Sequence, residues 1–361
     1  MIKLAEPFIC EEEIDAVVGV LKSRNICQGE KVKEFEKRFA EHVGVKHAMA
    51  VSNGTAALYC ALAAAGIKKG DEVITTPLTF IATANSVLMA NAKPVFVDVD
   101  ERMFNVNGKL IEEAVTDKTK AIMPVHLFGQ SCEMDVINEI AERHNLTVIE
   151  DACQAHGAEF NGKRVGSFGK MGCFSFYATK NITTGEGGMI TTDNEEMMIK
   201  VREFREHGSL VRDNYDKLGY NFRMTDINAA IGIEQLKRLD GFNERRIENA
   251  AYLSERLKNV KGLILPVVGN GRRHIFNQYT VRVGSEFGLS RDELMKVLRE
   301  NEIGCNVYYP VPLHKQKLYD KKCSLPVAEK AAGEVLSVPV HPGVSKSDLD
   351  KIAEVIKQHE A

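Results

Sequence analysis

Long apolar segments are absent from this sequence. No apolar run reaches the ~18 residues that would suggest a membrane span. The opening residues, "MIKLAEPFICEEEIDAVV", carry acids early and lack the apolar core of a signal peptide. We therefore expect no membrane partner and a cytoplasmic location.

Paired cysteines and metal-binding motifs are missing as well. The eight cysteines are scattered and none forms a CxxC pair, which favours reduced thiols over a disulfide framework. The ten histidines form no HExxH motif and no Cys/His ligand group. We expect no metal site.

A strong excess of charge is also absent. The formal net charge is −3 over 361 residues, so no overall basic field points to a nucleic-acid partner. Hydrophobic residues make up 44% and charged residues 27%, which is typical of a globular protein. The length suits two domains, and the chain has no internal repeat and no low-complexity linker.

The sequence does contain a regular alternation of helical and extended segments up to about residue 240. Ile14, Val17, Val18 and Leu21 lie on one stripe of a helix expected at 11–22. Further helices are expected at 32–44, 55–66, 79–91 and 134–145, and strands at 47–52, 71–76, 93–100, 120–129, 146–151, 172–177 and 187–193. This pattern predicts an α/β fold whose mostly parallel sheet is covered by helices on both faces.

A different pattern follows this alternation. Residues 227–260 form one long helical stretch, with a break expected near Gly241. Beyond it we expect a strand at 275–283, a helix at 290–304, an extended stretch at 305–312 and a final helix at 345–358. We divide the chain into a large domain of residues 1–240 and a smaller α+β domain of residues 241–361, joined rigidly by the long helix. The first helix could pack on the smaller domain.

The stretch "SNGTAAL" is the first of three candidate sites that follow strands, where open parallel sheets bind ligands. Ser52, Asn53, Gly54 and Thr55 end one strand and begin an alanine-rich helix. Free N–H groups at a helix start bind phosphate, and Gly54 lets an anion approach closely. A plain N-cap by Ser or Asn is the alternative.

The second candidate site is the pair Glu150 and Asp151, at the end of the strand "LTVIED". A carboxylate beside a hydrophobic sheet is costly unless a cation meets it. Asp151 therefore suggests a buried cation without naming it. A helix cap is again the alternative.

The third candidate site is Lys180, in the stretch "FYATKNITTGEGGM" near Ser175 and Thr179. A lone lysine is usually a solvated surface residue, but a desolvated lysine loses its proton more easily and can form a Schiff base with a carbonyl. Pyridoxal 5'-phosphate carries a phosphate, an aldehyde and a ring nitrogen that needs a carboxylate. This single cofactor would account for all three sites.

Four motifs extend this hypothesis to a family. "SNGTAAL", "EDACQAHGAEFNGKRVGSFG", "FSFYATKNITTGEGGM" and "GYNFRMTDINAAIG" resemble those of the nucleotide-sugar aminotransferases of the DegT/StrS family, which are fold-type I pyridoxal phosphate enzymes. The resemblance covers nearly the whole chain. It implies an aspartate-aminotransferase-like large domain with a mostly parallel, seven-stranded sheet, followed by a smaller α+β domain.

The resemblance also implies cofactor roles for individual residues. Lys180 and Asp151 would be catalytic, with Lys180 forming the Schiff base and Asp151 pairing with the ring nitrogen. Gln154 would contact the ring hydroxyl, and Phe80 would stack on the ring. The phosphate would be bound by Gly54, Thr55 and Ser175, and also by Asn221 from a neighbouring subunit. A homodimer with a shared active site follows from this last role. Asn53 stands where the family often has Ser, and Cys153 where Ala is common.

Candidate substrate residues come from the same resemblance. Tyr309 and His314, in "YYPVPLH", match a substrate loop, although Tyr309 could instead be a packing aromatic. Arg223 could anchor the glutamate carboxylate or the sugar diphosphate, or form an ion pair between subunits. Arg24 and Gln28 lie in "SRNICQG", which is similar to a segment near the nucleotide sugar.

The implied reaction is transfer of an amino group from L-glutamate to C4 of a nucleotide-linked keto-deoxysugar. "NITTGEGG" looks like the enzymes that act at C4, whereas those acting at C3 more often read "YGDGG", and "GYNFRMTDINAAIGIEQL" is similar to perosamine-synthase-type members. Family dehydratases have a histidine at the position of Lys180, so the lysine favours amino transfer. Amination at C3, a pyridoxal phosphate lyase or dehydratase, and a regulatory cofactor-binding protein are the alternatives.

Overall fold

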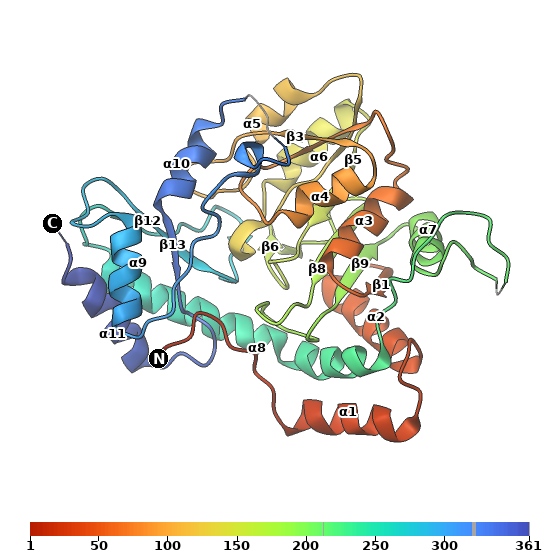
Figure 1. Ribbon diagram of the computed structural model, residues 1–361, viewed down its shortest axis with the longest axis horizontal. Coiled ribbons are helices and arrows are strands. Elements are labelled where there is room, and N and C mark those ends of the chain that lie inside the picture. Colours follow the sequence, from red (N-terminus) through yellow and green to blue (C-terminus); the bar gives the residue numbers. More distant parts are fainter. Residues whose placement is uncertain (212, 320–322, 361) are drawn as a thin grey trace.

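The computed structural model describes residues 1–211, 213–319 and 323–360, and it has the predicted α/β architecture (Figure 1). Its large sheet has the strand order β1-β9-β8-β5-β4-β2-β3. In this sheet β9 runs antiparallel to both of its neighbours, and the other recorded pairings are parallel. The strands are β1 (His47–Val51), β2 (Glu72–Thr75), β3 (Lys93–Phe96), β4 (Thr119–Ile122), β5 (Thr147–Asp151), β8 (Met171–Ser175) and β9 (Gly188–Thr192).

Helices cover both faces of this sheet, because successive strand residues alternate between two apolar clusters. Met49 and Val51 of β1 belong to a cluster with α3 (Gly54–Ala64), α4 (Ala82–Met89) and α7 (Glu195–Arg205). Ala48 and Ala50 belong to a second cluster with α2 (Glu30–Val43) and α8 (Asp226–Leu257). On the same side as this second cluster, α6 (Met134–Arg143) packs on β4 and β5. Strands buried on both faces are typical of parallel sheets.

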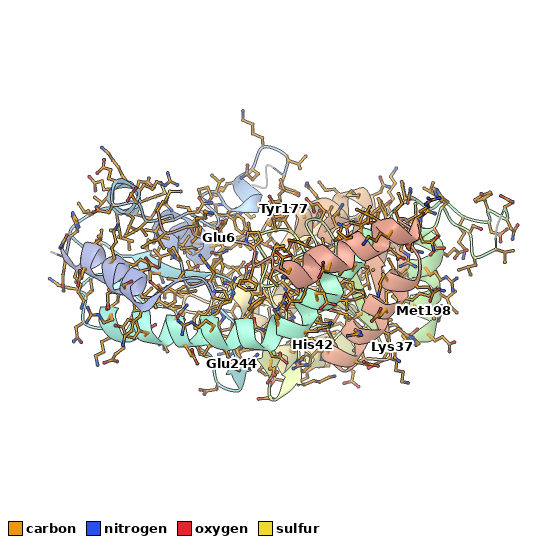
Figure 2. All side chains as sticks on the ribbon, turned by 90° about the horizontal axis from the view of Figure 1, so that it is seen from below. Glu6, Lys37, His42, Tyr177, Met198 and Glu244 are labelled. Atoms are coloured by element: carbon orange, nitrogen blue, oxygen red, sulfur yellow. The ribbon has the colours of Figure 1, made fainter. Side chains whose placement is uncertain are left out.

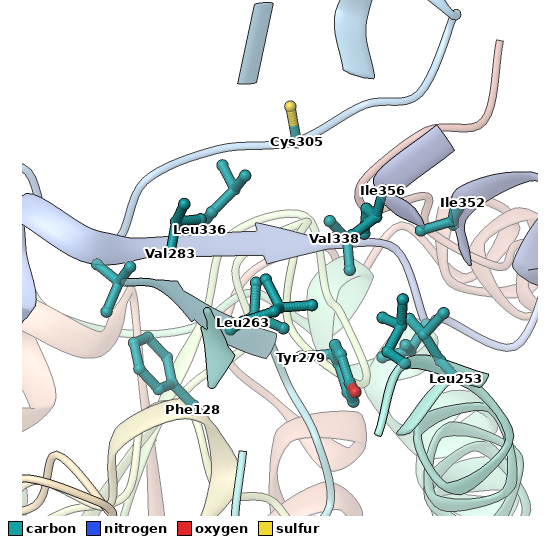
Figure 3. Close-up of a cluster of buried hydrophobic side chains, with 14 of the residues drawn as sticks. Phe128, Leu253, Leu263, Tyr279, Val283, Cys305, Leu336, Val338, Ile352 and Ile356 are labelled. Atoms are coloured by element: carbon teal, nitrogen blue, oxygen red, sulfur yellow. The ribbon is translucent and has the colours of Figure 1, made fainter. Parts of the chain in front are cut away.

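A separate apolar core occupies the carboxy-terminal part of the chain. Figure 3 shows Leu263, Tyr279 and Val338 of its three-stranded sheet beside Leu253 of α8 and Ile352 of the last helix. The elements around this core are β10 (Leu263–Ile264), β12 (Tyr279–Val283), β13 (Val335–Val338), α9 (Arg291–Glu300), α10 (Pro326–Glu334) and α11 (Lys346–Lys357). A capping box begins α9, with Ser290 as the N-cap and Glu293 three residues later.

Short elements complete the chain. The small sheet β11-β6-β7 lies outside the large one. Its strands and the remaining short helices are β6 (Glu159–Phe160), β7 (Lys163–Arg164), β11 (Arg272–Arg273), α5 (Gly108–Ile111), η1 (Glu112–Ala114), η2 (Leu127–Gly129) and η3 (Leu313–Lys315). The extended stretch expected at 305–312 forms no strand, and within it an isolated bridge joins Asn306 to Ser337.

The long helix α8 is continuous, so the break expected near Gly241 is wrong. Glycine costs about 1 kcal/mol in a helix interior, and tertiary packing along α8 overrides that cost. Gly241 itself has open space where a side chain would be. Figures 1 and 2 show α8 running from beneath the large sheet to the carboxy-terminal core.

The amino-terminal helix α1 (Glu11–Ser23) packs on α8 rather than on the carboxy-terminal core. Glu13 is buried, accepts a hydrogen bond from Gln235 at 2.9 Å and pairs with Arg238. The residues before α1 do reach the carboxy-terminal part, where Ile2 pairs with Ile303. The predicted stripe of α1 faces outward, with Ile14 47%, Val18 37% and Leu21 53% exposed.

Candidate active site

A cavity of about 920 Å³ opens at the carboxyl ends of the parallel strands. It is within the range of roughly 300–1,000 Å³ that is typical of small-molecule sites. Segments from all three candidate sites meet there. Of the residues singled out in the sequence, the cavity is lined by Asn53, Gly54, Thr55, Phe80, Asp151, Cys153, Gln154, Ser175, Thr179, Lys180 and Tyr309.

The amino terminus of α3 forms one wall of the cavity. Asn53 is the N-cap, and its side-chain oxygen accepts a hydrogen bond from the Ala56 N–H at 2.8 Å. Gly54 is essential to the packing here, because a Cβ at this position would lie 2.7 Å from Ser175 Cβ and 3.2 Å from Cys153 Sγ. The first N–H groups of a helix lack intrahelical partners and carry the positive end of its dipole. This wall therefore suits an anion.

Asp151 is the last residue of β5 and is buried. Its Oδ2 accepts a hydrogen bond from the Thr83 hydroxyl at 2.7 Å, and its Oδ1 accepts one from the Cys153 N–H at 3.2 Å. The Thr83 hydroxyl is in turn 2.9 Å from the Thr79 hydroxyl. Sequence reasoning missed both threonines, although their spacing of four residues in "PLTFIATA" was the available signal.

Gln154 joins two distant parts of the chain. Its Oε1 accepts a hydrogen bond from the Phe128 N–H at 2.9 Å, and its Nε2 donates one to the Tyr309 hydroxyl at 3.2 Å. The backbone donor therefore fixes which end of the amide faces the cavity. Tyr309 also lies beside Phe80, with ring centroids 6.3 Å apart, and Phe80 is 55% exposed.

Lys180 lies in the loop between β8 and β9. Hydrogen bonds close this loop at its base, from the Phe176 N–H to Gly187 O at 2.8 Å and from the Thr184 N–H to Phe176 O at 3.0 Å. The Asn181 side chain, next to the lysine, donates to Asn243 Oδ1 of α8 at 2.7 Å. A tied loop of this kind holds the lysine in place.

Burial lowers the pKa of Lys180 below its ordinary value, and the nearby Cys153 and Asp151 oppose that shift. Burial also raises the pKa of the Cys153 thiol, which is therefore neutral at neutral pH, so Asp151 is the group that opposes the shift of Lys180. A lysine amine with a lowered pKa is more often unprotonated, as a nucleophile or a base must be.

Glu150, the neighbour of Asp151, faces away from this cavity. It is fully buried and accepts hydrogen bonds from the N–H groups of Gly166, Phe168 and Gly169 at 2.7–2.8 Å. His126 Nε2 lies 3.0 Å from its second oxygen. Glu150 therefore holds the 166–169 loop, and the paired acids in the sequence have separate environments.

The other predicted site residues lie outside this cavity. Arg24 and Gln28 line a second hollow of about 1050 Å³ between α1 and α8. His314 is buried, with its Nε2 3.0 Å from Glu329 Oε1. Asn221 and Arg223 are exposed on the segment before α8.

One cluster among the described residues has ligand atoms close enough for a metal ion, and it comprises Cys10, Glu12 and Glu13. The Cys10 thiol donates to Glu13 Oε2 at 2.8 Å, and Arg238 pairs with both glutamates. These contacts already satisfy the cluster. Within the described ranges, no helix combines the length and apolar character needed to cross a membrane.

With this geometry in place, comparison with known proteins identifies the family. The DegT/DnrJ/EryC1/StrS aminotransferase family matches residues 7–357. This chain belongs to that family. It is 42% identical over 362 residues to the GDP-perosamine synthase of Caulobacter vibrioides, a match that covers 99% of this chain and 98% of the relative.

Two further proteins are similar to this chain over most of its length. The UDP-N-acetyl-3-dehydro-alpha-D-glucosamine 3-aminotransferase of Acidithiobacillus ferrooxidans is 39% identical over 351 residues, covering 96% of this chain and 94% of the relative. Spr1654 from Streptococcus pneumoniae, solved in a PLP-form, superposes with a TM-score of 0.94 at 28% identity, covering 99% of this chain and 98% of that one. The expected family and fold class are confirmed.

Proposed function

We propose that the protein transfers an amino group from L-glutamate to the keto carbon, at C4, of a nucleotide-linked keto-deoxysugar, with pyridoxal 5'-phosphate as its cofactor. The product would be an amino sugar for cell-surface or secondary-metabolite glycans. The observation that carries this proposal is the convergence of Lys180, Asp151 and the amino terminus of α3 on one cavity. The related GDP-perosamine synthase and sugar 3-aminotransferase support the substrate class.

The cavity residues fit this cofactor. Gly54 packs so closely on Ser175 that a side chain at 54 would clash, and the amino terminus of α3 with the hydroxyl groups of Thr55 and Ser175 forms a cradle on the cavity wall. We assign the phosphate to this cradle, the aldehyde to Lys180 and the ring nitrogen to Asp151. Spr1654, which shares the fold, has been solved in both a PLP-form and a PMP-form.

Other cavity residues would orient the cofactor. The Gln154 Nε2 has one hydrogen directed to Tyr309, and the amide carries a second, which we assign to the ring hydroxyl. Phe80 stands at the mouth, where its half-exposed ring can cover one face of the cofactor. When bound, pyridoxal phosphate accepts the amino group and withdraws electrons from the carbon next to the nitrogen.

The side chains of the protein would then move protons and hold the reacting groups in position. The Lys180 amine would take the proton from the α carbon of glutamate as a base and, as an acid, would return it to the carbon on the other side of the transferred nitrogen. Its lowered pKa suits that role, because the free amine must accept a proton near neutral pH. Asp151 would keep the ring nitrogen protonated throughout.

We also propose a homodimer with a shared active site. Among the described residues, the charged side chains lining the cavity are Asp151, Lys180 and Glu186, which supply one cation for a cofactor phosphate, a glutamate carboxylate and a sugar diphosphate. Additional cations must then come from elsewhere, and Arg223 is exposed and available to a second copy. The outward stripe of α1 offers apolar surface for such a contact.

Amination at C3 is the second candidate for the position of transfer. The name of the Acidithiobacillus relative specifies a 3-aminotransferase, and its 39% identity is close to the 42% of the perosamine synthase. Our preference for C4 depends on the stretch "NITTGEGG" between Asn181 and Gly188. One or two side chains in a substrate pocket can change such a preference.

The test uses purified protein loaded with pyridoxal phosphate. We expect visible absorbance that glutamate bleaches within one half-reaction, and amino transfer to one member of a panel of nucleotide-linked keto sugars. NMR of the product then identifies the carbon that gained nitrogen, and nitrogen at C3 would refute the positional part. Lys180→Ala should abolish transfer, whereas Lys163→Ala, a lysine on the outer strand β7, should leave it unchanged. Turnover by Lys180→Ala would overturn the proposed function.

A further inference from the structure

A short hydrogen-bonded chain behind the cavity leads to Asp151. Thr79, Thr83 and Asp151 are all buried, with the Thr79 and Thr83 hydroxyl oxygens 2.9 Å apart and Thr83 Oγ1 2.7 Å from Asp151 Oδ2. Thr83 lies in the first turn of α4, Thr79 lies in the segment before that helix, and Asp151 comes from the end of β5. The contact therefore joins segments that are 68 residues apart in the sequence.

The chemistry of the carboxylate sets the direction of this chain. An ionised carboxylate only accepts hydrogen bonds, so the single proton of the Thr83 hydroxyl must point at Asp151. The Thr83 oxygen is then left as an acceptor, and the Thr79 hydroxyl must donate to it. Hydrogen bonds in series polarise one another, which strengthens the final donor.

Helix capping does not explain these threonines. The N-cap of α4 is Ile81, and no side chain accepts a hydrogen bond at that position. The Thr83 backbone N–H bonds to Phe80 O, and the Thr83 carbonyl accepts from the Ser86 hydroxyl at 2.8 Å. The Thr83 hydroxyl is thus committed to Asp151 and Thr79 rather than to its own helix.

We propose that Thr83 is a positioning residue for Asp151, and that Thr79 supports it through the second hydrogen bond. Cys153 N–H holds one carboxylate oxygen and Thr83 holds the other, so the carboxylate cannot turn freely about its last bond. The inference rests on the proposed function, in which Asp151 is the partner of the cofactor ring nitrogen. A carboxylate held in one orientation keeps its charge aimed at that nitrogen.

Thr83→Val tests this proposal, because it removes the hydroxyl and nearly preserves the shape. We expect apoprotein carrying this change to bind pyridoxal phosphate about tenfold more weakly, which is the effect of about 1.4 kcal/mol. Thr83→Ser retains a hydroxyl and should bind within about twofold of wild type, and Thr79→Val should fall between the two, since it removes only the supporting hydrogen bond. The loaded Thr83→Val protein should also show a shifted pH dependence of its visible absorbance.

Thr75→Val is the matched control. Thr75 is equally buried, and its hydroxyl donates to the Met123 carbonyl at 2.9 Å within the sheet rather than in the site. It should lower stability as much as Thr83→Val does, while leaving cofactor affinity unchanged. Urea unfolding of both variants separates a general loss of stability from a loss at Asp151, and Thr83→Ala replaces Thr83→Val if the latter does not fold.

A double-mutant cycle with Asp151→Asn decides whether Thr83 acts through Asp151. We expect Thr83→Val to have no further effect on cofactor affinity once the carboxylate is an amide. An equal loss in both backgrounds, or a Thr83→Val protein that matches Thr83→Ser, would overturn the inference. Failure of the proposed function gives a different result, because the wild-type apoprotein would then take up no pyridoxal phosphate at all.

Discussion

Exchanging Glu150 for glutamine should destabilise the fold strongly, whereas exchanging its neighbour Asp151 for asparagine should not. Oε1 of Glu150 accepts hydrogen bonds from the N–H groups of Phe168 and Gly169, both at 2.8 Å. Its Oε2 accepts one from Gly166 N–H at 2.7 Å and faces His126 Nε2 at 3.0 Å. The carboxylate thus serves four donors in a fully buried position.

The magnitude follows from what the amide cannot do. His126 Nδ1 accepts a hydrogen bond from Cys132 N–H at 3.1 Å, so its Nε2 carries the proton and also needs an acceptor. In Glu150→Gln, an NH₂ group faces one of the two donor pairs, and two hydrogen bonds to a charged acceptor are lost. Each is worth roughly 1.5–3 kcal/mol, which gives about 3–6 kcal/mol in total. That is a large part of the roughly 5–15 kcal/mol that stabilises a typical domain.

Asp151→Asn meets a milder environment. Its two oxygens accept from one hydroxyl and one N–H group, and the Thr83 hydroxyl can rotate to accept from the new amide. We expect a change in the free energy of unfolding of less than about 1.5 kcal/mol, together with weak binding of pyridoxal phosphate.

Urea unfolding of the two apoproteins, followed by circular dichroism, is the assay. Glu150→Gln should unfold at a clearly lower urea concentration than wild type, or fail to accumulate in folded form. Asp151→Asn should unfold near the wild-type midpoint and yet lose cofactor affinity. Equal urea midpoints for the two variants would refute the conclusion that Glu150 stabilises the fold and Asp151 serves the site.

Three further predictions concern single buried or half-buried groups. Burial lowers the pKa of His156 to about 3, so its stabilising effect is present above the unfolded value of about 6.5 and is lost as the pH falls. In His156→Phe, the free energy of unfolding measured with urea should therefore depend less steeply on pH between about pH 6 and 4, by one proton or about 1.4 kcal/mol per pH unit. Gln154→Ala leaves the Phe128 N–H without its acceptor and should cost about 1–3 kcal/mol in unfolding experiments, whereas an unchanged midpoint would contradict that hydrogen bond. Phe80→Ala should change stability by less than about 0.5 kcal/mol because the ring is 55% exposed, while a fluorescence titration should show weaker binding of pyridoxal phosphate.

Much of the large sheet could be predicted from the sequence, because a strand buried on both faces is a short apolar run with turn residues at its ends. Each of the seven strands lies within or overlaps an expected segment. The helices α7 and α10 and the strand β13 were not expected. β13 has only four residues and follows α10 directly, which leaves little local pattern to read.

Gly241 and α1 show where local patterns mislead. The glycine predicted a break, but packing at both ends keeps α8 intact through that position. The stripe of Ile14, Val18 and Leu21 predicted a helix correctly and did not say which way that stripe faces. The direction in which a helix stripe faces depends on the segments that pack on it. In the proposed dimer, the second copy of the chain packs on this stripe of α1.

The candidate site could be predicted in outline and not in detail. Sheet topology places Asp151 and Lys180 near the carboxyl ends of the neighbouring strands β5 and β8, and the chemistry of each motif suggested one cofactor that both would bind. The hydrogen bond from Thr83 joins α4 to the end of β5 across 68 residues, and the four-residue spacing of the threonines does not reveal that distant partner. The roles of Asn221 and Arg223 stay predictions, because they depend on a second copy of the chain.

The order of the cavity walls along the chain has a consequence for divergence. Every residue that we assign to the cofactor, Asn221 included, precedes α8, whereas Asn306, Val307, Tyr308 and Tyr309 follow it and also line the cavity. Substitutions in that later stretch can reshape the chamber in front of the cofactor without altering the chemistry behind it. A few substitutions after α8 can thus change the sugar preference, while the groups that react stay the same.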